Sequence, residues 1–193
     1  MTPPHPIAGD PNAGDPDADR GAYDRLRRRV LWAMPTGLYL IGSRADQPDG
    51  TVRRNLMTAN LVVQVATRPK LVAVAVDGTA VTCDLVDAGG CFAVSILRRD
   101  DRAVVRRFVK PVDQVEVDGA GRAVALAGHP VVEEATGAPI LAAAAGWLDC
   151  EVRHRLPLGS HHLFVGEVVA AGGPDGDLPE VLRMEDTRMS YGG

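Results

Sequence analysis

Short runs of β-forming residues recur along this chain and limit its possible folds more than any other feature. The most continuous run is 71–76, which reads Leu-Val-Ala-Val-Ala-Val. Neither face of a strand with this sequence would carry a polar side chain. A strand with one face in water alternates apolar and polar residues, so this run predicts a central strand covered on both faces. Helical patterns are few and short, and no β–α–β rhythm joins the runs. The sequence therefore predicts a mainly β fold with a few short helices.

The other elements are expected from periodicity and from turn residues. Strands are predicted at 37–43, 51–57, 61–65, 71–76, 91–97, 124–127, 142–156, 159–171 and 179–184. Helices are predicted at 22–34, 77–89 and 100–109, and the pattern between 112 and 139 is weak. We expect Pro35 to end the first helix, Thr79 to be the N-cap of the second and Gly89 to be its C′ residue.

Length and composition favour one folded domain behind a short tail. A chain of 193 residues can bury a sizeable core, and no internal repeat divides it. Residues 1–20 are rich in Pro, Gly, Asp and Ala and have almost no apolar side chain to bury. We therefore expect a disordered tail at 1–20 and a single domain over 21–193.

Charge and cysteine usage exclude several classes of function. The formal net charge is −4, which argues against nucleic-acid binding by bulk positive charge. Cys83, Cys91 and Cys150 are odd in number and lack Cys-x-x-Cys spacing, which is typical of a reduced, intracellular protein. No apolar run approaches the roughly 20 residues of a membrane span, and the N-terminus lacks a signal-peptide pattern. We expect a cytoplasmic protein with no membrane and no nucleic-acid partner.

Polar side chains gather in three clusters at predicted strand ends. The first, 54–60, reads Arg-Asn-Leu-Met-Thr-Ala-Asn; the second, 79–82, carries two threonines; the third, 159–162, reads Gly-Ser-His-His. Donors concentrated where a chain leaves a sheet suit an anion or a flat heteroaromatic ring. The alternative interpretation is a polar turn, a pair of helix-capping threonines and two edge-strand histidines. Because strand ends of a barrel can meet at one rim, we expect the clusters to converge on one ligand site.

Other chemical motifs are incomplete. Gly119 and Gly121 begin a dinucleotide-like pattern, but Val124 stands where its third glycine is needed. The chain has no phosphate-binding GxxxxGK[ST] motif and no GxSxG motif. His161 and His162 should point to opposite faces of a strand, and no third ligand is suitably spaced, so we predict no metal site.

Several pieces of the chain, taken in order and spacing, resemble the flavin reductase-like, FMN-binding split-barrel family. The resemblance runs from about residue 29 to residue 184, most of the expected domain. The pieces that carry it are Met34-Pro-Thr-Gly37, Asn55-Leu-Met-Thr-Ala-Asn60, Arg68-Pro-Lys-Leu-Val-Ala-Val-Ala75, Gly90-Cys-Phe-Ala-Val-Ser-Ile-Leu97, Ala145-Gly-Trp-Leu-Asp-Cys150 and Gly159-Ser-His-His-Leu-Phe-Val-Gly-Glu-Val168.

The resemblance implies a split β-barrel of Greek-key type and a homodimer with FMN near the subunit interface. It implies that 57–60 contact the isoalloxazine ring or ribityl chain, and that 79–82 and an arginine hold the phosphate. The cofactor-binding residues implied in this way are Arg54, Asn55, Met57, Thr58, Ala59, Asn60, Thr79, Ala80 and Thr82.

The resemblance also singles out His161 as the catalytic residue, on the nicotinamide side of the flavin. The family often has Gly-Asp-His at this point, whereas Ser160 replaces the aspartate here. His162 faces the other way on a regular strand, so we expect His161 to face the flavin.

The resulting hypothesis is an NADH- or NADPH-dependent reductase of FMN, or of FAD, that supplies reduced flavin to a separate monooxygenase. Flavin carries the hydride itself, which agrees with so few candidate catalytic side chains. Two alternatives stay open: a flavin-binding carrier without reductase activity, and a protein that binds a deazaflavin. The sequence does not decide between NADH and NADPH or between FMN and FAD, and it does not name the partner oxygenase.

Overall fold

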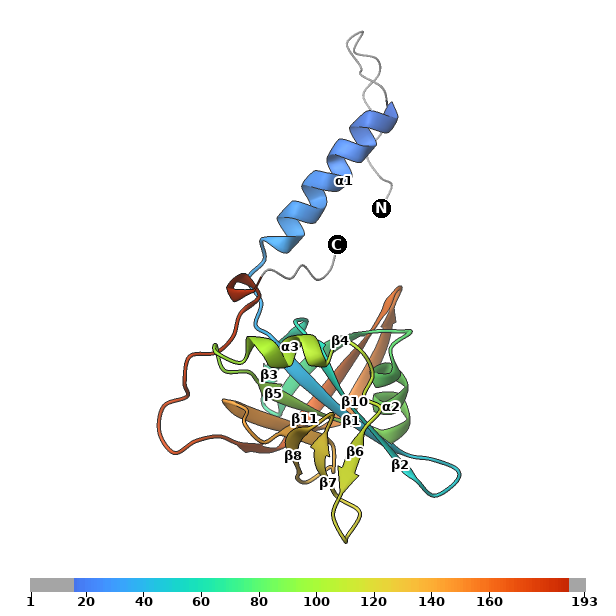
Figure 1. Ribbon diagram of the computed structural model, residues 1–193. Coiled ribbons are helices and arrows are strands. Elements are labelled where there is room, and N and C mark those ends of the chain that lie inside the picture. The colour runs from blue at the N-terminus through green and yellow to red at the C-terminus, as the bar shows by residue number, and fades with distance from the viewer. Residues whose placement is uncertain (1–15, 188–193) are drawn as a thin grey trace. The chain divides into compact units, whose positions relative to one another are not determined.

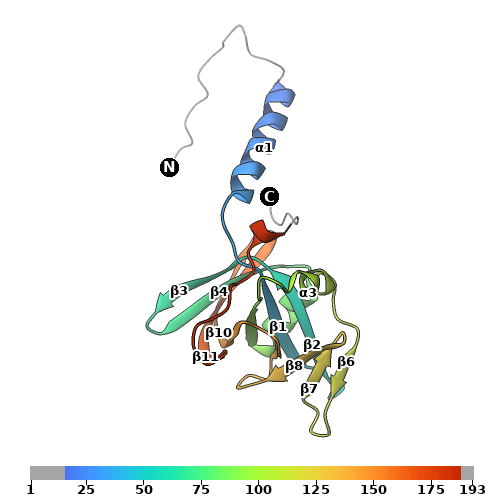
Figure 2. The same ribbon diagram turned by 60° about the vertical axis from the view of Figure 1, so that its left-hand side comes forward.

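The computed structural model describes residues 16–187, which fall into two separate units (Figures 1 and 2). One unit contains the helix α1 (Pro16–Trp32), and the other contains the described residues from 36 to 187. The predicted helix at 22–34 therefore begins earlier, and 16–20 are not the tail we expected. A proline is well tolerated in the first turn of a helix, where its missing N–H has no intrahelical partner to lose. The rest of the predicted tail, 1–15, lies outside the described residues.

The larger unit is built on a seven-stranded antiparallel sheet with the order β2-β1-β5-β10-β11-β4-β3. Its strands are β1 (Tyr39–Asp46), β2 (Val52–Ala59), β3 (Val62–Thr67), β4 (Lys70–Asp77), β5 (Cys91–Ile96), β10 (Gly146–Leu158) and β11 (His161–Gly172). The mainly β prediction is confirmed, and so is the inner position of the strand at 71–76, because β4 pairs with a strand on each side. The hydrogen-bonded ladder ends at β2 and β3 and does not close.

A second sheet of four short strands has the order β6-β7-β8-β9. Its strands are β6 (Val115–Val117), β7 (Ala123–Leu126), β8 (His129–Glu133) and β9 (Pro139–Leu141). The sequence predicted only the strand at 124–127. The others are three to five residues long, too short for a period of two to be seen, and Pro130 and Pro139 stand inside two of them.

Two short helices and one turn of 3₁₀ helix complete this unit: α2 (Val81–Gly89), α3 (Arg102–Arg107) and η1 (Met184–Asp186). The predicted caps of α2 are wrong by one residue each: Ala80 is the N-cap, and Gly90 is the left-handed residue at φ 65°. The predicted strand at 179–184 is reduced to isolated bridges, Gly37 with Arg183 and Arg98 with Val181. None of the helices within 16–187 has the length and apolarity that crossing a bilayer requires.

The core of the larger unit lies on both faces of the main sheet. One cluster of buried side chains draws on β1, β2, β4, β5, β10 and β11, and α2 adds Cys83 and Val86. The half-buried Val62 of β3 packs against this cluster, so the sheet curls around it. The other cluster lies between the outer face of β1 and β2, α3 and the small sheet. Leu56 belongs to the outer cluster and Ala59 to the inner one, so β2 is covered on both sides.

Candidate functional site

The first polar cluster lies almost wholly within β2, which extends two residues beyond the predicted strand end at 57, and the alternative interpretation as a turn is wrong. Positions 54–59 belong to β2, and Asn60 alone follows it. Alternate side chains of a strand point to opposite faces, so the cluster divides in two. One face carries Arg54, Leu56 and Thr58, and the other carries Asn55, Met57 and Ala59.

The outward-facing polar side chains of β2 bind the rest of the fold. Arg54 forms an ion pair with Glu133 in which each side chain is only 7% exposed, and it donates to the Gly121 carbonyl at 2.8 Å. The Thr58 hydroxyl donates to the Val105 carbonyl at 2.7 Å. These contacts fasten β2 to the small sheet and to α3. A role in flavin binding for these two side chains remains a prediction.

The inward-facing amide of β2 reaches the start of α2. Asn55 Nδ2 donates to the Thr82 hydroxyl at 2.9 Å, and its Oδ1 accepts the Val112 N–H at 2.8 Å. Both Asn55 and Thr82 are buried, so this amide has its partners inside the protein. Asn60 lies five residues further on, where its Nδ2 is 3.5 Å from the Thr36 hydroxyl. The cluster thus reaches α2 at Asn55 and not at Asn60.

The second and third clusters lie side by side. The Gly78 N–H donates to the Ser160 carbonyl at 2.9 Å, and Asp77 is the register partner of His161. Asp77 accepts both the N–H and the hydroxyl of Thr79, at 2.8 and 2.7 Å. These two hydrogen bonds, with a smaller contribution from His161, lower the pKa of the Asp77 carboxyl. On the other strand end, Ser160 Oγ lies 2.9 Å from His161 Nδ1.

The first turn of α2 is therefore where parts of all three clusters meet. Thr82 holds the amide of Asn55, and the turn that leads into the helix is bonded to the strand end that carries His161. Ala80, the N-cap, provides no side-chain cap. The first N–H groups of a helix have no intrahelical partner, and together with the helix dipole they favour an anion.

His162 belongs to a network that sequence reasoning missed. Its Nδ1 is 3.2 Å from Cys83 Sγ and 3.0 Å from a guanidinium nitrogen of Arg155, and Arg155 is ion-paired with Asp87. Its ring also packs edge-on against Phe164, whose side chain is in the inner core. The four-residue spacing of Cys83 and Asp87 on one helix face was the available signal, but their partners are more than 65 residues away in sequence.

His162 Nδ1 faces two donor groups. Arginine has no acceptor, so Nδ1 is the acceptor in the contact with Arg155. Burial of the Cys83 thiol raises its pKa, so the sulfur stays protonated at neutral pH. The network is thus a structural link between β10, β11 and α2.

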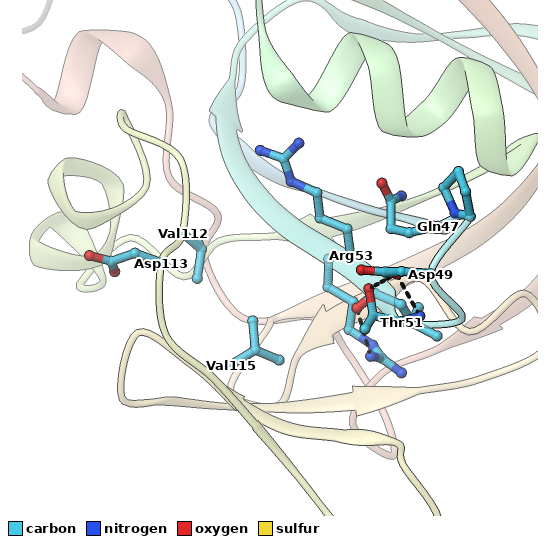
Figure 3. A pocket seen from close by; sticks show the side chains of 10 residues that line it. Gln47, Asp49, Thr51, Arg53, Val112, Asp113 and Val115 are labelled. Atoms are coloured by element: carbon cyan, nitrogen blue, oxygen red, sulfur yellow. Dashed lines mark hydrogen bonds between the residues drawn. The ribbon is translucent and has the colours of Figure 1, made fainter.

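A cavity of about 560 Å³ lies between the β1–β2 hairpin and residues 112–115 (Figure 3). It is lined by Gln47, Pro48, Asp49, Thr51, Val52, Arg53, Arg54, Val112, Asp113 and Val115. Figure 3 shows the hairpin residues on one side, those of 112–115 on the other and Arg53 between them. Sequence reasoning did not identify this cavity, because its two walls are separated by about 60 residues.

The chain belongs to the flavin reductase-like family, whose model matches residues 31–192. It is 33% identical to the NADH-dependent FAD reductase of Streptomyces globisporus over 155 residues, which is 77% of this chain and 76% of the relative. It is 30% identical to the NADH-dependent FMN reductase AsuE2 of Streptomyces nodosus subsp. asukaensis, with 82% and 84% covered.

Solved structures of flavin reductases are also similar to this chain. The NADH:FAD oxidoreductase SgcE6 of Streptomyces globisporus superimposes with a TM-score of 0.61 at 28% identity, covering 90% of this chain and 84% of that chain. The styrene monooxygenase flavin reductase of Pseudomonas putida S12 has a TM-score of 0.61 at 25% identity, with 82% and 90% covered.

Proposed function

We propose that the protein is an oxidoreductase that uses NADH or NADPH to reduce a flavin, FMN or FAD, and passes the reduced flavin to a separate monooxygenase. The observation that carries the proposal is the meeting of the donor clusters at the start of α2 in a chain of the flavin reductase-like family. The solved structure named as a styrene monooxygenase flavin reductase supports a monooxygenase partner, and a relative named as a stachydrine N-demethylase reductase subunit supports a separate enzyme as partner.

The residues at the start of α2 fit the phosphate end of a flavin. Ala80 leaves the helix N-terminus free of a side-chain cap, and the Thr79 N–H and hydroxyl are held in place by Asp77. Thr79, Ala80 and Thr82 would hold the phosphate through backbone N–H groups and hydroxyls. Asn55 would orient this turn through Thr82, and Met57, Ala59 and Asn60 would lie along the ring or ribityl chain. Bound flavin supplies the hydride chemistry, so the protein has to bind and orient two cofactors and exclude water.

His161 is the side chain that we assign to the nicotinamide side. Its Nδ1 faces the Ser160 hydroxyl at 2.9 Å, which leaves Nε2 for a ligand. The ring Nε2–H would donate a hydrogen bond to the nicotinamide carboxamide, or to the flavin as negative charge develops on it.

We also infer that the enzyme works as a homodimer. β3 is an edge strand of the main sheet, and Leu61, Val63 and Val65 on or beside it are 43%, 59% and 51% exposed. Exposed apolar edge strands promote association, and a second copy would cover this one. Light scattering should give about twice the chain mass of 20.4 kDa at micromolar concentration. A mass of one chain with flavin bound would contradict this.

A cytoplasmic location is part of the same proposal. Cys83, Cys91 and Cys150 are all buried and free, which suits a reducing compartment. NADH and NADPH are also available there. Detection of the protein in the cytosolic fraction of fractionated cells would support this assignment, and its recovery outside the cell would contradict it.

The test of function is an absorbance spectrum of the purified protein followed by NADH and NADPH oxidation assays with added FMN or FAD. We expect a flavin spectrum and flavin-dependent oxidation of the nicotinamide. Flavin binding without nicotinamide oxidation would identify a carrier instead, the alternative that Ser160 favours. A deazaflavin spectrum would replace the cofactor assignment.

A further inference from the structure

Two neighbouring arginines on β2 have different environments. Arg54 is buried and ion-paired with Glu133, so its charge is already neutralised. Arg53 is exposed, and no residue among 16–187 forms an ion pair or hydrogen bond with its guanidinium. Arg53 lines the cavity at the β1–β2 hairpin. It is therefore the arginine of this pair that is available to an anionic ligand.

One wall of the cavity is linked to the start of α2 by hydrogen bonds through the buried Asn55. Val112 lines the cavity, and its N–H binds Asn55 Oδ1 at 2.8 Å, while the other end of this amide binds Thr82 at 2.9 Å. Arg53 and Asn55 are alternate residues of β2, about 7 Å apart along one face. A ligand with one phosphate at the start of α2 would thus have a cationic side chain and a cavity within reach of a second phosphate.

The lining of the cavity suits a ribonucleotide. Pro48, Val52, Val112 and Val115 provide apolar walls for a flat base. Asp49 uses Oδ1 to accept the Thr51 N–H and hydroxyl, at 2.9 and 2.7 Å, and these bonds lower its pKa. It therefore stays a carboxylate, with Oδ2 free to accept ribose hydroxyls, the usual role of an acidic residue in dinucleotide sites.

The second carboxylate at the cavity, Asp113, forms an ion pair with an arginine. Its Oδ1 is 3.9 Å from an Arg107 guanidinium nitrogen. The cavity volume of about 560 Å³ is in the usual range for small-molecule sites, about 300–1,000 Å³.

We propose that this cavity holds the adenosine 5′-phosphate half of FAD, with Arg53 on the phosphate and Asp49 on the ribose, so that the enzyme prefers FAD to FMN. The inference rests on the proposed function, because it places the flavin phosphate at the start of α2. It adds a second subsite that FMN does not fill, and it assigns discrimination between the two flavins to Arg53.

The test is fluorescence titration of FAD and FMN against the full-length protein and its variants. We expect the unaltered protein to bind FAD more tightly than FMN. Arg53→Ala should weaken FAD about tenfold, the effect of one lost charge-assisted hydrogen bond, and change FMN less than twofold. Arg106→Ala, which removes an exposed arginine of α3 outside the cavity, is the matched control and should change neither.

A second variant tests the cavity without removing charge. Val115→Trp puts a large ring into the space while the position is 38% exposed, so folding should persist, which a thermal melt checks. FAD should again be weakened about tenfold while FMN is retained. Equal losses for FAD and FMN would overturn the proposal and place Arg53 on the phosphate that both share.

The two hypotheses fail in different ways. FMN binding that is as tight as FAD binding in the unaltered protein, or variants that alter neither affinity, would overturn the adenosine subsite while the flavin reductase assignment stands. A protein that binds neither flavin would overturn both.

Discussion

The two faces of β2 carry similar residues and serve different purposes. On the outer face, the polar groups of Arg54 and Thr58 are used within the fold, by Glu133 and by the Val105 carbonyl. On the other face, the amide of Asn55 leads to the start of α2, where the flavin is proposed to bind. Neighbouring donors in a sequence therefore need not belong to one site, because alternate residues of a strand face opposite sides of the sheet. Variants of each region can separate stability from cofactor binding.

The largest expected effect is on the outer face. Glu133→Ala leaves Arg54 buried without its counter-ion, which should cost about 3–5 kcal/mol of unfolding free energy. For a domain of this size the melting temperature should fall on the order of 10 °C. Thermal and urea unfolding measure the change. Glu134→Ala, at the exposed neighbouring residue, is the control and should change stability by less than about 0.5 kcal/mol. Equal stability of the two variants would contradict a structural role for the pair.

The next effect separates the two histidines. His161→Ala should reduce kcat/KM for NAD(P)H about tenfold, which is about 1.4 kcal/mol, and leave flavin affinity nearly unchanged. His162→Ala removes the contacts with Cys83 and Arg155 and should instead lower the melting temperature with a smaller kinetic effect. Steady-state kinetics, flavin titration and thermal melts on both variants decide this. A larger kinetic defect in His162→Ala would show that the catalytic histidine was assigned to the wrong strand face.

A smaller effect is expected for Thr58→Val, which nearly conserves volume. The variant leaves the Val105 carbonyl without its donor and should lower unfolding free energy by about 1–2 kcal/mol. Urea unfolding measures this cost. The resemblance to the family predicts in addition a several-fold loss of flavin affinity, and a fluorescence titration of the same variant tests it. Unchanged affinity would remove Thr58 from the flavin site, and unchanged stability would show that the hydroxyl is not needed by α3.

The smallest effect is a pH dependence at the turn before α2. The folded protein lowers the pKa of Asp77 from its ordinary value of 3.8, mainly through the Thr79 hydroxyl and N–H. The unfolded chain thus binds the proton more readily than the folded protein does. The contribution of ionised Asp77 to the free energy of unfolding is complete above pH 3.8, and it is lost as the pH falls through the lower pKa of the folded protein. Asp77→Asn should therefore be less stable than the unaltered protein at pH 6, and the difference should shrink towards pH 3. Urea unfolding at both pH values measures it, and a difference that grows on acidification would contradict this sign.

The elements that local patterns specify were predicted well. The strands at 71–76 and 91–97 correspond to β4 and β5, and the helix at 77–89 contains α2, because periodicity and turn residues act within a few residues of the chain. The boundaries were less accurate, since Ala80 and not Thr79 is the N-cap of α2. A cap is defined by backbone geometry at one residue, and two adjacent residues with similar propensity do not specify which one adopts it.

The short strands of the small sheet could not be found in the same way. β6, β8 and β9 pair with residues that are near in sequence, but their own patterns are too brief to differ from a loop. They are stabilised by the outer core, where Val131 and Leu141 pack against Leu40 and Leu56 of β1 and β2. Packing against a distant strand, and not propensity, makes these residues extended.

The sequence by itself determined the class of fold, the family and the three polar clusters, because each depends on residues that are close together in the chain. Only the tertiary structure decided which donors remain available. Arg54 and Glu133 are 79 residues apart, as are Cys83 and His162, so neither partner is visible from the local pattern of the other. A buried polar group takes whichever partner the packing brings within hydrogen-bonding distance, since leaving it unpaired is costly. That choice uses Arg54 for the fold and leaves Arg53 beside a cavity.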